Sequence, residues 1–214
     1  MIEAIATYFA QNGADWLQMV AEHLAISATA LLVACALALP LGVACSASAL
    51  TERLAGGVAG VFRVIPSLAV LILCVPVLGV GTPPAVAALT VLAIPPILIN
   101  TAVAFRSVPA AVIEAALGMG MSEAQVLLAV RLPLAMPAIL AGLRLACVST
   151  VGIATVAAAI NAGGLGAVFF SGLRTMSIDK ILGGTICCAA LALAFEAGLG
   201  AAARACERRL HVES

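Results

Sequence analysis

The side chains that most often perform chemistry are few in this sequence and lie far apart. The two histidines, His23 and His211, stand near opposite ends, and neither an H-E-x-x-H nor a G-x-S-x-G stretch occurs. No glycine-rich loop is followed by lysine, since the one lysine is Lys180, so the ATP-binding loop of that type is absent as well. The residues therefore argue against a membrane-embedded enzyme and against an ATP site in this chain.

Metal and disulfide chemistry is not indicated either. The cysteines lie mostly inside apolar stretches, without paired C-x-x-C spacing or nearby histidine ligands. They are Cys35, Cys45, Cys74, Cys147, Cys187, Cys188 and Cys206. We expect them to be ordinary small apolar residues, and we expect neither a metal site nor a cofactor in this chain.

Glu196 is the acidic residue that lies well inside an apolar run. Carboxylates within a membrane normally face protein, water or a basic partner. We expect Glu196 to form a structural ion pair or to reach toward the membrane interface. Proton coupling is the alternative, but the sequence offers no other buried acid or histidine for a relay.

The elements that must position these residues are membrane helices. The chain is 64% hydrophobic and 9% charged, whereas soluble domains are about 45–50% apolar and about 25% charged. In hydrocarbon the backbone must satisfy its own hydrogen bonds, and the apolar runs lack the alternation of barrel strands. We therefore expect an all-α membrane protein in contact with lipid. The net charge of +0 excludes a basic surface for nucleic acid.

Runs of about 20 apolar residues predict five transmembrane helices. They lie near 24–45, 61–79, 84–105, 138–160 and 181–203. Residues 1–22 are interpreted as an extracytoplasmic amphipathic segment or a frayed lead-in, 23–203 as the transmembrane domain, and 204–214 as a cytoplasmic tail. Because the first basic residue is Arg53, we expect no cleaved leader.

The distribution of basic residues predicts the orientation, because short cytoplasmic loops are enriched in them. With the N-terminus outside, two basic residues fall outside, Arg174 and Lys180. The others fall inside or at inner helix ends: Arg53, Arg63, Arg106, Arg131, Arg144, Arg204, Arg208 and Arg209. We therefore expect the N-terminus outside and the C-terminus in the cytoplasm.

The long polar interruption between the third and fourth spans, 106–137, predicts two short helices around a glycine turn. Ser107 is placed to cap the first helix, with Pro109 in its opening turn, and Ser122 and Gln125 have capping-box spacing for the second. The break is assigned to Gly118 and Gly120, and the end of the second helix to Pro133. A helix pair this apolar, too short to span and on the basic side, needs a protein groove to bury it.

The segment is similar to the EAA loop of binding-protein-dependent ABC importer permeases. Glu114-Ala115-Ala116 is followed after three residues by Gly120 and after nine more by Val130-Arg131-Leu132-Pro133, where the family usually has Ile in place of Val130. The resemblance covers roughly 20–205. It implies a multi-pass protein of the bacterial inner membrane with the type I (MetI-like) fold. It also implies that the coupling loop seats in an ATPase cleft through Glu114, Ala115, Ala116, Gly120, Val130, Leu132 and Pro133.

A narrower resemblance is to glycine betaine, carnitine and choline uptake permeases. It rests on Ile65-Pro66-Ser67-Leu68-Ala69, 79–82, 114–121 and 162–166, although Ile99-Asn100-Thr101 replaces the Arg-Asn-Thr frequent in that group. The implied partners are a cytoplasmic ABC ATPase dimer that binds ATP and Mg²⁺, a second permease copy or related permease, and an extracytoplasmic binding protein. The alternatives are import of another small solute such as an amino acid, or a transporter driven by an ion gradient.

The substrate cage of such a system is expected outside this chain. Quaternary ammonium groups are best held by several aromatic faces, and the one Trp, one Tyr and six Phe here are scattered. The pore then needs a weak polar lining, because a tight site would hinder release. The candidates are Ser67, Asn100, Ser149, Thr150, Thr155 and Asn161, for each of which helix–helix hydrogen bonding is the alternative.

Overall fold

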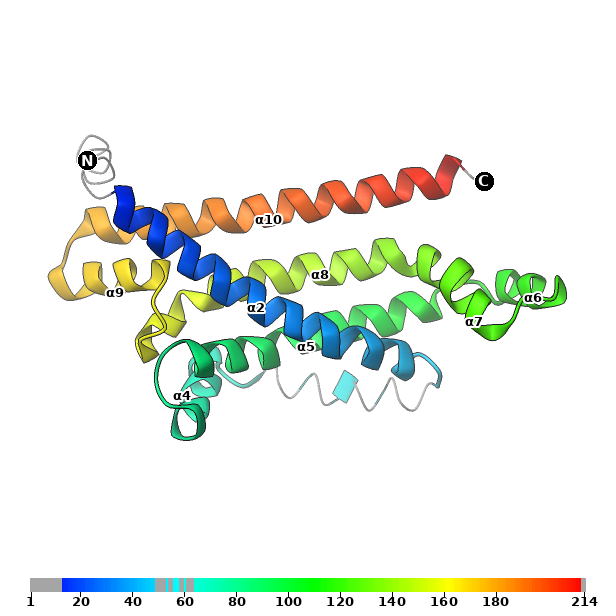
Figure 1. The fold of residues 1–214 in the computed structure, drawn as a ribbon, viewed down its shortest axis with the longest axis horizontal. Helices are drawn as coiled ribbons and strands as arrows, with labels where there is room; N and C mark the ends of the chain where they lie inside the picture. The colour runs from blue at the N-terminus through cyan, green and yellow to red at the C-terminus, as the bar shows by residue number, and fades with distance from the viewer. Residues whose placement is uncertain (1–12, 49–52, 54–55, 58–59, 61–63, 213–214) are drawn as a thin grey trace.

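The computed structural model describes residues 13–48, 53, 56–57, 60 and 64–212, and shows a bundle of helices (Figure 1). The long helices are α2 (Gly13–Cys45), α5 (Thr82–Arg106), α8 (Leu132–Ala154) and α10 (Ile178–Val212). The shorter elements are α4 (Ser67–Leu78), α6 (Ala110–Gly118), α7 (Glu123–Gln125), the π-helical turn η1 (Val126–Arg131), the 3₁₀ turn η2 (Val156–Ile160) and α9 (Leu165–Thr175).

Within the described residues, four helices are long and apolar enough to cross a membrane: Gly13–Cys45, Thr82–Arg106, Glu123–Ala154 and Ile178–Ala205. They contain the first, third and fifth predicted spans, and the fourth span runs past the end of α8 into η2. The described part of the second span is the shorter apolar helix α4, while positions 61–63 lie outside the described residues. The all-α membrane fold is confirmed.

Small residues bring the central helices α2, α5 and α8 into close contact. Ala30, Ala34 and Ala38 recur every four residues along α2, and each is fully buried. A Cβ at Gly42 would lie 2.6 Å from Cβ of Thr101, and one at Gly142 would lie 2.4 Å from Cβ of Asn100. Close packing through small residues, expected from the sequence, therefore sets how α5 faces its two neighbours.

The bundle has two distinct ends. The first turn of α2 lies beside α9 at one end, whereas α6, α7 and the last turns of α10 lie toward the other (Figure 1). The segment predicted to bind a cytoplasmic partner is thus at the same end as Val212. The described part of the chain before residue 24 is not a separate segment, because α2 is continuous from Gly13 to Cys45.

Two details predicted for the polar interruption are wrong. The Ser107 hydroxyl donates to Ala104 O and closes α5, while Pro109 is the N-cap residue of α6. Pro133 ends no helix: it lies in the first turn of α8, directly after η1, in which Leu132 N–H donates to Leu127 O. Pro133 has no N–H to donate, and it is accommodated inside this continuous helix where the π turn has already interrupted the α-helical hydrogen-bond pattern.

The predicted capping box at the start of α7 is confirmed. The Ser122 N–H donates to Oε1 of Gln125 at 2.8 Å, and the Gln125 N–H donates to Oγ of Ser122 at 3.3 Å. These bonds satisfy two backbone donors at the start of the continuous helix Glu123–Ala154.

Ser122→Ala is expected to speed hydrogen exchange of the Gln125 amide by about fivefold, because loss of an N-cap side chain costs about 1 kcal/mol. The measurement is amide exchange in detergent micelles. Ser122→Asp keeps an acceptor oxygen at the N-cap and serves as the control, with near wild-type exchange. Equal exchange in the alanine and aspartate variants would contradict this role of the capping box.

Candidate functional site

The turn between α6 and α7 is built on Gly120, whose φ of +87° lies in the left-handed region. The Gly120 N–H donates to Leu117 O at 2.9 Å, and the Met121 N–H donates to Ala116 O at 3.2 Å. A Cβ at Gly120 would meet no described atom within 4 Å. A side chain at this position would therefore have room, but residues other than glycine adopt this φ only at a cost in free energy. The backbone conformation of the turn is thus the reason for glycine here.

The predicted coupling residues divide between the surface and the interior of this segment. Glu114, Ala115 and Gly120 are exposed, and Ala116 is buried. Val130, Leu132 and Pro133 are half-buried. The first three can touch a partner, whereas the others hold the segment on the bundle.

Arg131 completes this attachment, and the sequence analysis assigned it no role in the site. Its guanidinium donates to the carbonyl of Phe105 at 3.2 Å and lies 5.6 Å from the centre of the Phe105 ring. The contact ties the η1 turn to the last residues of α5. Its position between Val130 and Leu132 in the quoted motif was the signal that could have identified it.

An exposed apolar surface accompanies the turn, which we call the α6 patch. It consists of Val112, Leu117, Met119 and Leu128, and Met119 and Leu128 are 77% and 63% exposed. Exposed apolar side chains on one short segment suit contact with a protein partner. The patch lies on α6, on the turn after it and on η1, at the end of the bundle opposite α9 (Figure 1).

Two of the six candidates for the solute pathway line the same groove. Ser67 and Ser149 line a groove of about 590 Å³ between α4, α5 and α8. Thr155 lines a separate groove of about 400 Å³ between α8, α9 and α10. These three hydroxyl residues are therefore the candidates placed at open space.

The other candidates serve local structure. Asn100 donates from Nδ2 to Pro96 O at 2.8 Å and lies against Gly142, where α5 crosses α8. Thr150 is 2% exposed. Asn161 ends η2 in a left-handed conformation with φ of 65°. Helix packing and chain reversal are the local roles that these residues have in the fold, and no hydrogen bond from one helix to another is found for them among the described contacts.

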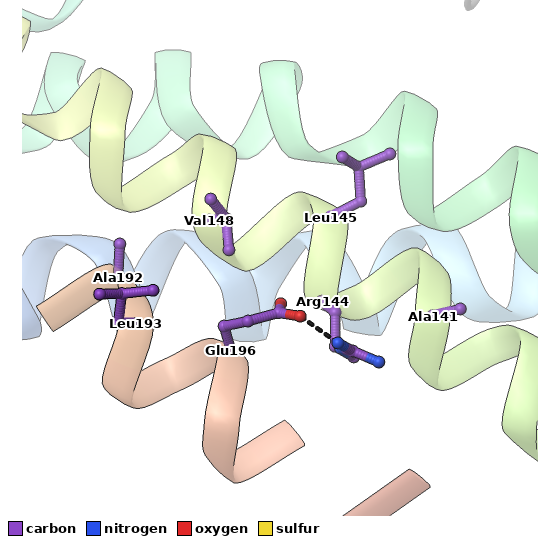
Figure 2. Close-up of a pocket in the computed structure, with 7 residues that line it drawn as sticks. All are labelled: Ala141, Arg144, Leu145, Val148, Ala192, Leu193 and Glu196. Carbon is purple, nitrogen blue, oxygen red and sulfur yellow. Dashed lines mark hydrogen bonds and ion pairs between the residues drawn. The ribbon is translucent and has the colours of Figure 1, made fainter. Parts of the chain in front are cut away.

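A third groove, of about 490 Å³, contains an ion pair between α8 and α10 (Figure 2). Arg144 donates from one terminal nitrogen to Oε1 of Glu196, and each side chain is 35% exposed. The expected structural pairing of Glu196 is therefore found. Arg144 was placed inside or at an inner helix end, but it lies well within α8.

The three grooves lie on one face of the bundle, which we call the open face. The ion-pair groove shares Val148 and Ala192 with the Thr155 groove, and it shares Leu145 with the Ser67 groove. From Ala141 onward, the exposed residues of α8 follow helical spacing: Ala141, Leu145, Val148, Ser149 and Gly152. This exposed stripe of α8 separates the two grooves that α10 lines, the ion-pair groove and the Thr155 groove, from the Ser67 groove beside α4.

At the opposite end from the α6 patch, α2 holds the loop that leads into α9. The Gly164 N–H donates to Oε2 of Glu22 at 3.0 Å, and Nε2 of the buried His23 is 3.0 Å from Val151 O. Trp16 packs against Leu165 and Val168 of α9. Sequence reasoning missed this attachment, although the quoted glycine motif at 162–166 marked its position.

The fold is similar to that of multi-pass helical chains in solved ABC transporters. A chain of the inward-facing MetNI methionine ABC transporter matches with a TM-score of 0.78 over 86% of this chain and 93% of that one, at 24% identity. A chain of an amino acid ABC transporter crystallised with histidines gives 0.75 over 92% and 97%, at 17% identity.

The sequence defines the family. The chain belongs to the binding-protein-dependent transport system inner membrane components, whose family model matches residues 36–212. It is 41% identical over 199 residues to the carnitine transport permease protein OpuCB of Listeria monocytogenes, covering 93% of this chain and 91% of the relative. It is 36% identical over 200 residues to the choline transport system permease protein OpuBB of Bacillus subtilis, covering 94% and 92%. The chain is thus a multi-pass inner-membrane protein.

Proposed function

We propose that this chain is the permease subunit of an ATP-driven importer for small quaternary ammonium osmoprotectants. The observation that carries the proposal is similarity along nearly the whole chain to permeases named for carnitine and choline. A further relative, 37% identical over 183 residues, is the glycine betaine/carnitine/choline transport system permease protein OpuCB of Bacillus subtilis, covering 84% of this chain and 83% of the relative.

The α6 patch is proposed to seat in a cleft of a cytoplasmic ATPase, which binds ATP and Mg²⁺. Its exposed apolar residues need a protein cover. The α6–α7 end of the bundle and the C-terminal end of α10 then lie on the cytoplasmic side, and the α9 end faces the extracytoplasmic binding protein. Movement of the ATPase reaches the membrane helices through Arg131 and the continuous helix Glu123–Ala154.

The open face is proposed to turn toward a second permease copy or a related permease, with the solute pathway between them. Support comes from its polar groups, because Ser67, Ser149 and the Arg144–Glu196 pair lie at open grooves. A charged pair on a membrane helix belongs against protein or water rather than acyl chains.

The test is uptake into proteoliposomes that contain this chain with its ATPase and binding protein. Labelled glycine betaine, carnitine and choline are compared, with histidine as the control solute. At least one quaternary ammonium solute is expected to accumulate when ATP is supplied on the side of the membrane where the ATPase lies. It should not accumulate when a non-hydrolysable ATP analogue replaces ATP. Equal uptake without the ATPase would contradict the proposal, and so would uptake of histidine alone.

A further inference from the structure

The Arg144–Glu196 pair is placed where a small solute can reach it. Arg144 lies well inside α8 and Glu196 well inside α10, and each keeps 35% of its side-chain surface exposed. The groove of about 490 Å³ lies within the usual range for small-molecule sites, about 300–1,000 Å³. Figure 2 shows the two charged groups facing each other across this groove, with Val148 and Leu193 beside them.

The charge of this cluster is unbalanced and its hydrogen bonding is incomplete. A Cβ at Gly200 would lie 3.5 Å from Cζ of Arg144 and 3.5 Å from a terminal nitrogen of Arg204, so two guanidinium groups lie near Gly200, while the one carboxylate of Glu196 pairs with Arg144. Nε of Arg144 is buried and has no hydrogen-bond partner among the described residues. A second carboxylate would balance the charge and give the guanidinium a further acceptor.

The groove also suits the other end of a quaternary ammonium solute. Val148 and Leu193 line it near the Glu196 side chain, so methyl groups on a cationic nitrogen would meet apolar side chains next to a negative charge. The binding would remain weak, because each end of the solute competes with the internal ion pair. A weak site suits a pathway from which the solute must leave.

We propose that Arg144 and Glu196 contact the solute in transit and favour zwitterions that carry a carboxylate and a quaternary ammonium over cations without the carboxylate. Arg144 binds the carboxylate and Glu196 attracts the cationic nitrogen. The inference rests on the proposed import function. It assigns to this chain a share of the selectivity in addition to that of a binding protein.

The variants Arg144→Gln and Glu196→Gln separate this role from a structural tie between α8 and α10. Uptake of glycine betaine, a zwitterion, and of choline, a cation, is measured in proteoliposomes with one ATPase and one binding protein throughout. Arg144→Gln is expected to lower the betaine-to-choline uptake ratio. Glu196→Gln is expected to lower uptake of both solutes and to leave their ratio near wild type, because both carry the cationic nitrogen. Each loss should be roughly tenfold, the factor for loss of one charge-assisted interaction.

A double variant, Arg144→Gln with Glu196→Gln, controls for folding because it removes both charges of the ion pair. Its betaine-to-choline ratio is expected to fall to about that of Arg144→Gln at lower uptake of both solutes, since the preference for the carboxylate is lost with Arg144. A structural tie alone predicts equal losses for the two solutes in the Arg144→Gln variant, and that result would overturn the inference. Wild-type protein that takes up neither solute would instead refute the proposed function, and this inference with it.

Discussion

Gly166→Ala is expected to destabilise the folded chain by about 3 kcal/mol or more, at the upper end of overpacking effects. A Cβ at this position would lie 2.0 Å from the carbonyl oxygen of Thr155 and 2.8 Å from Cβ of Ala158. Because the nearest atom is backbone, relief requires movement of η2 away from α9. Thermal unfolding of the purified protein in detergent and the yield of folded protein measure the effect.

Gly198→Ala is the matched control, since Gly198 lies in α10 and a Cβ there would meet no described atom within 4 Å. Alanine is favoured over glycine inside a helix by about 0.5–1 kcal/mol. The control should therefore unfold at the wild-type temperature or slightly above it. If the Gly166 variant melted together with the Gly198 variant, the close approach of η2 to α9 would not be a constraint on this fold.

The long helices could be predicted from the sequence because hydrocarbon imposes one simple rule on them. A run of about 20 apolar residues must form a helix in a membrane, and this located α2, α5, α8 and α10. The same rule could not locate α9, which has eleven residues and is buried by Trp16 and by the loop at Gly164. Its position depends on tertiary contacts that no window of hydropathy contains.

The polar residues of the bundle show a second limit. Composition identified Asn100 and Ser149 equally as pathway candidates, yet Asn100 lies at a helix crossing and Ser149 at an open groove. The difference comes from the rotation of each helix about its axis. That rotation is set by close contacts such as the one between Gly142 and Asn100. The rotation cannot be predicted from the sequence of a helix that is apolar on all sides.

The α6–α7 turn was predicted best because short-range chemistry specifies it. The capping box at Ser122 and the left-handed Gly120 depend on residues a few positions away. Pro133 was misjudged because the rule that proline ends helices does not allow for a π turn, which interrupts the α-helical hydrogen bonds directly before it. Here Pro133 lies in the first turn of α8, after the π turn η1.

Met119→Glu is expected to abolish ATP-dependent uptake while leaving the chain itself folded. Met119 is 77% exposed at the α6 patch, so a carboxylate there remains in water in the isolated permease. In the proposed ATPase cleft it would be buried without a partner, at a cost of about 2–5 kcal/mol. Binding of the ATPase should weaken at least about thirtyfold. Co-purification of the ATPase and uptake in proteoliposomes measure the two effects.

Met176→Glu is the matched control because it makes the same chemical change at the opposite end of the bundle. Met176 is 86% exposed and ends α9, so the two variants add the same charge to surfaces of similar exposure. The control should keep ATPase binding, and both variants should unfold at the wild-type temperature in detergent. Uptake by the control is not part of the comparison, because the α9 end is proposed to face the binding protein. If the Met119 variant co-purified as much ATPase as the Met176 variant, the α6 patch would not be part of the coupling interface.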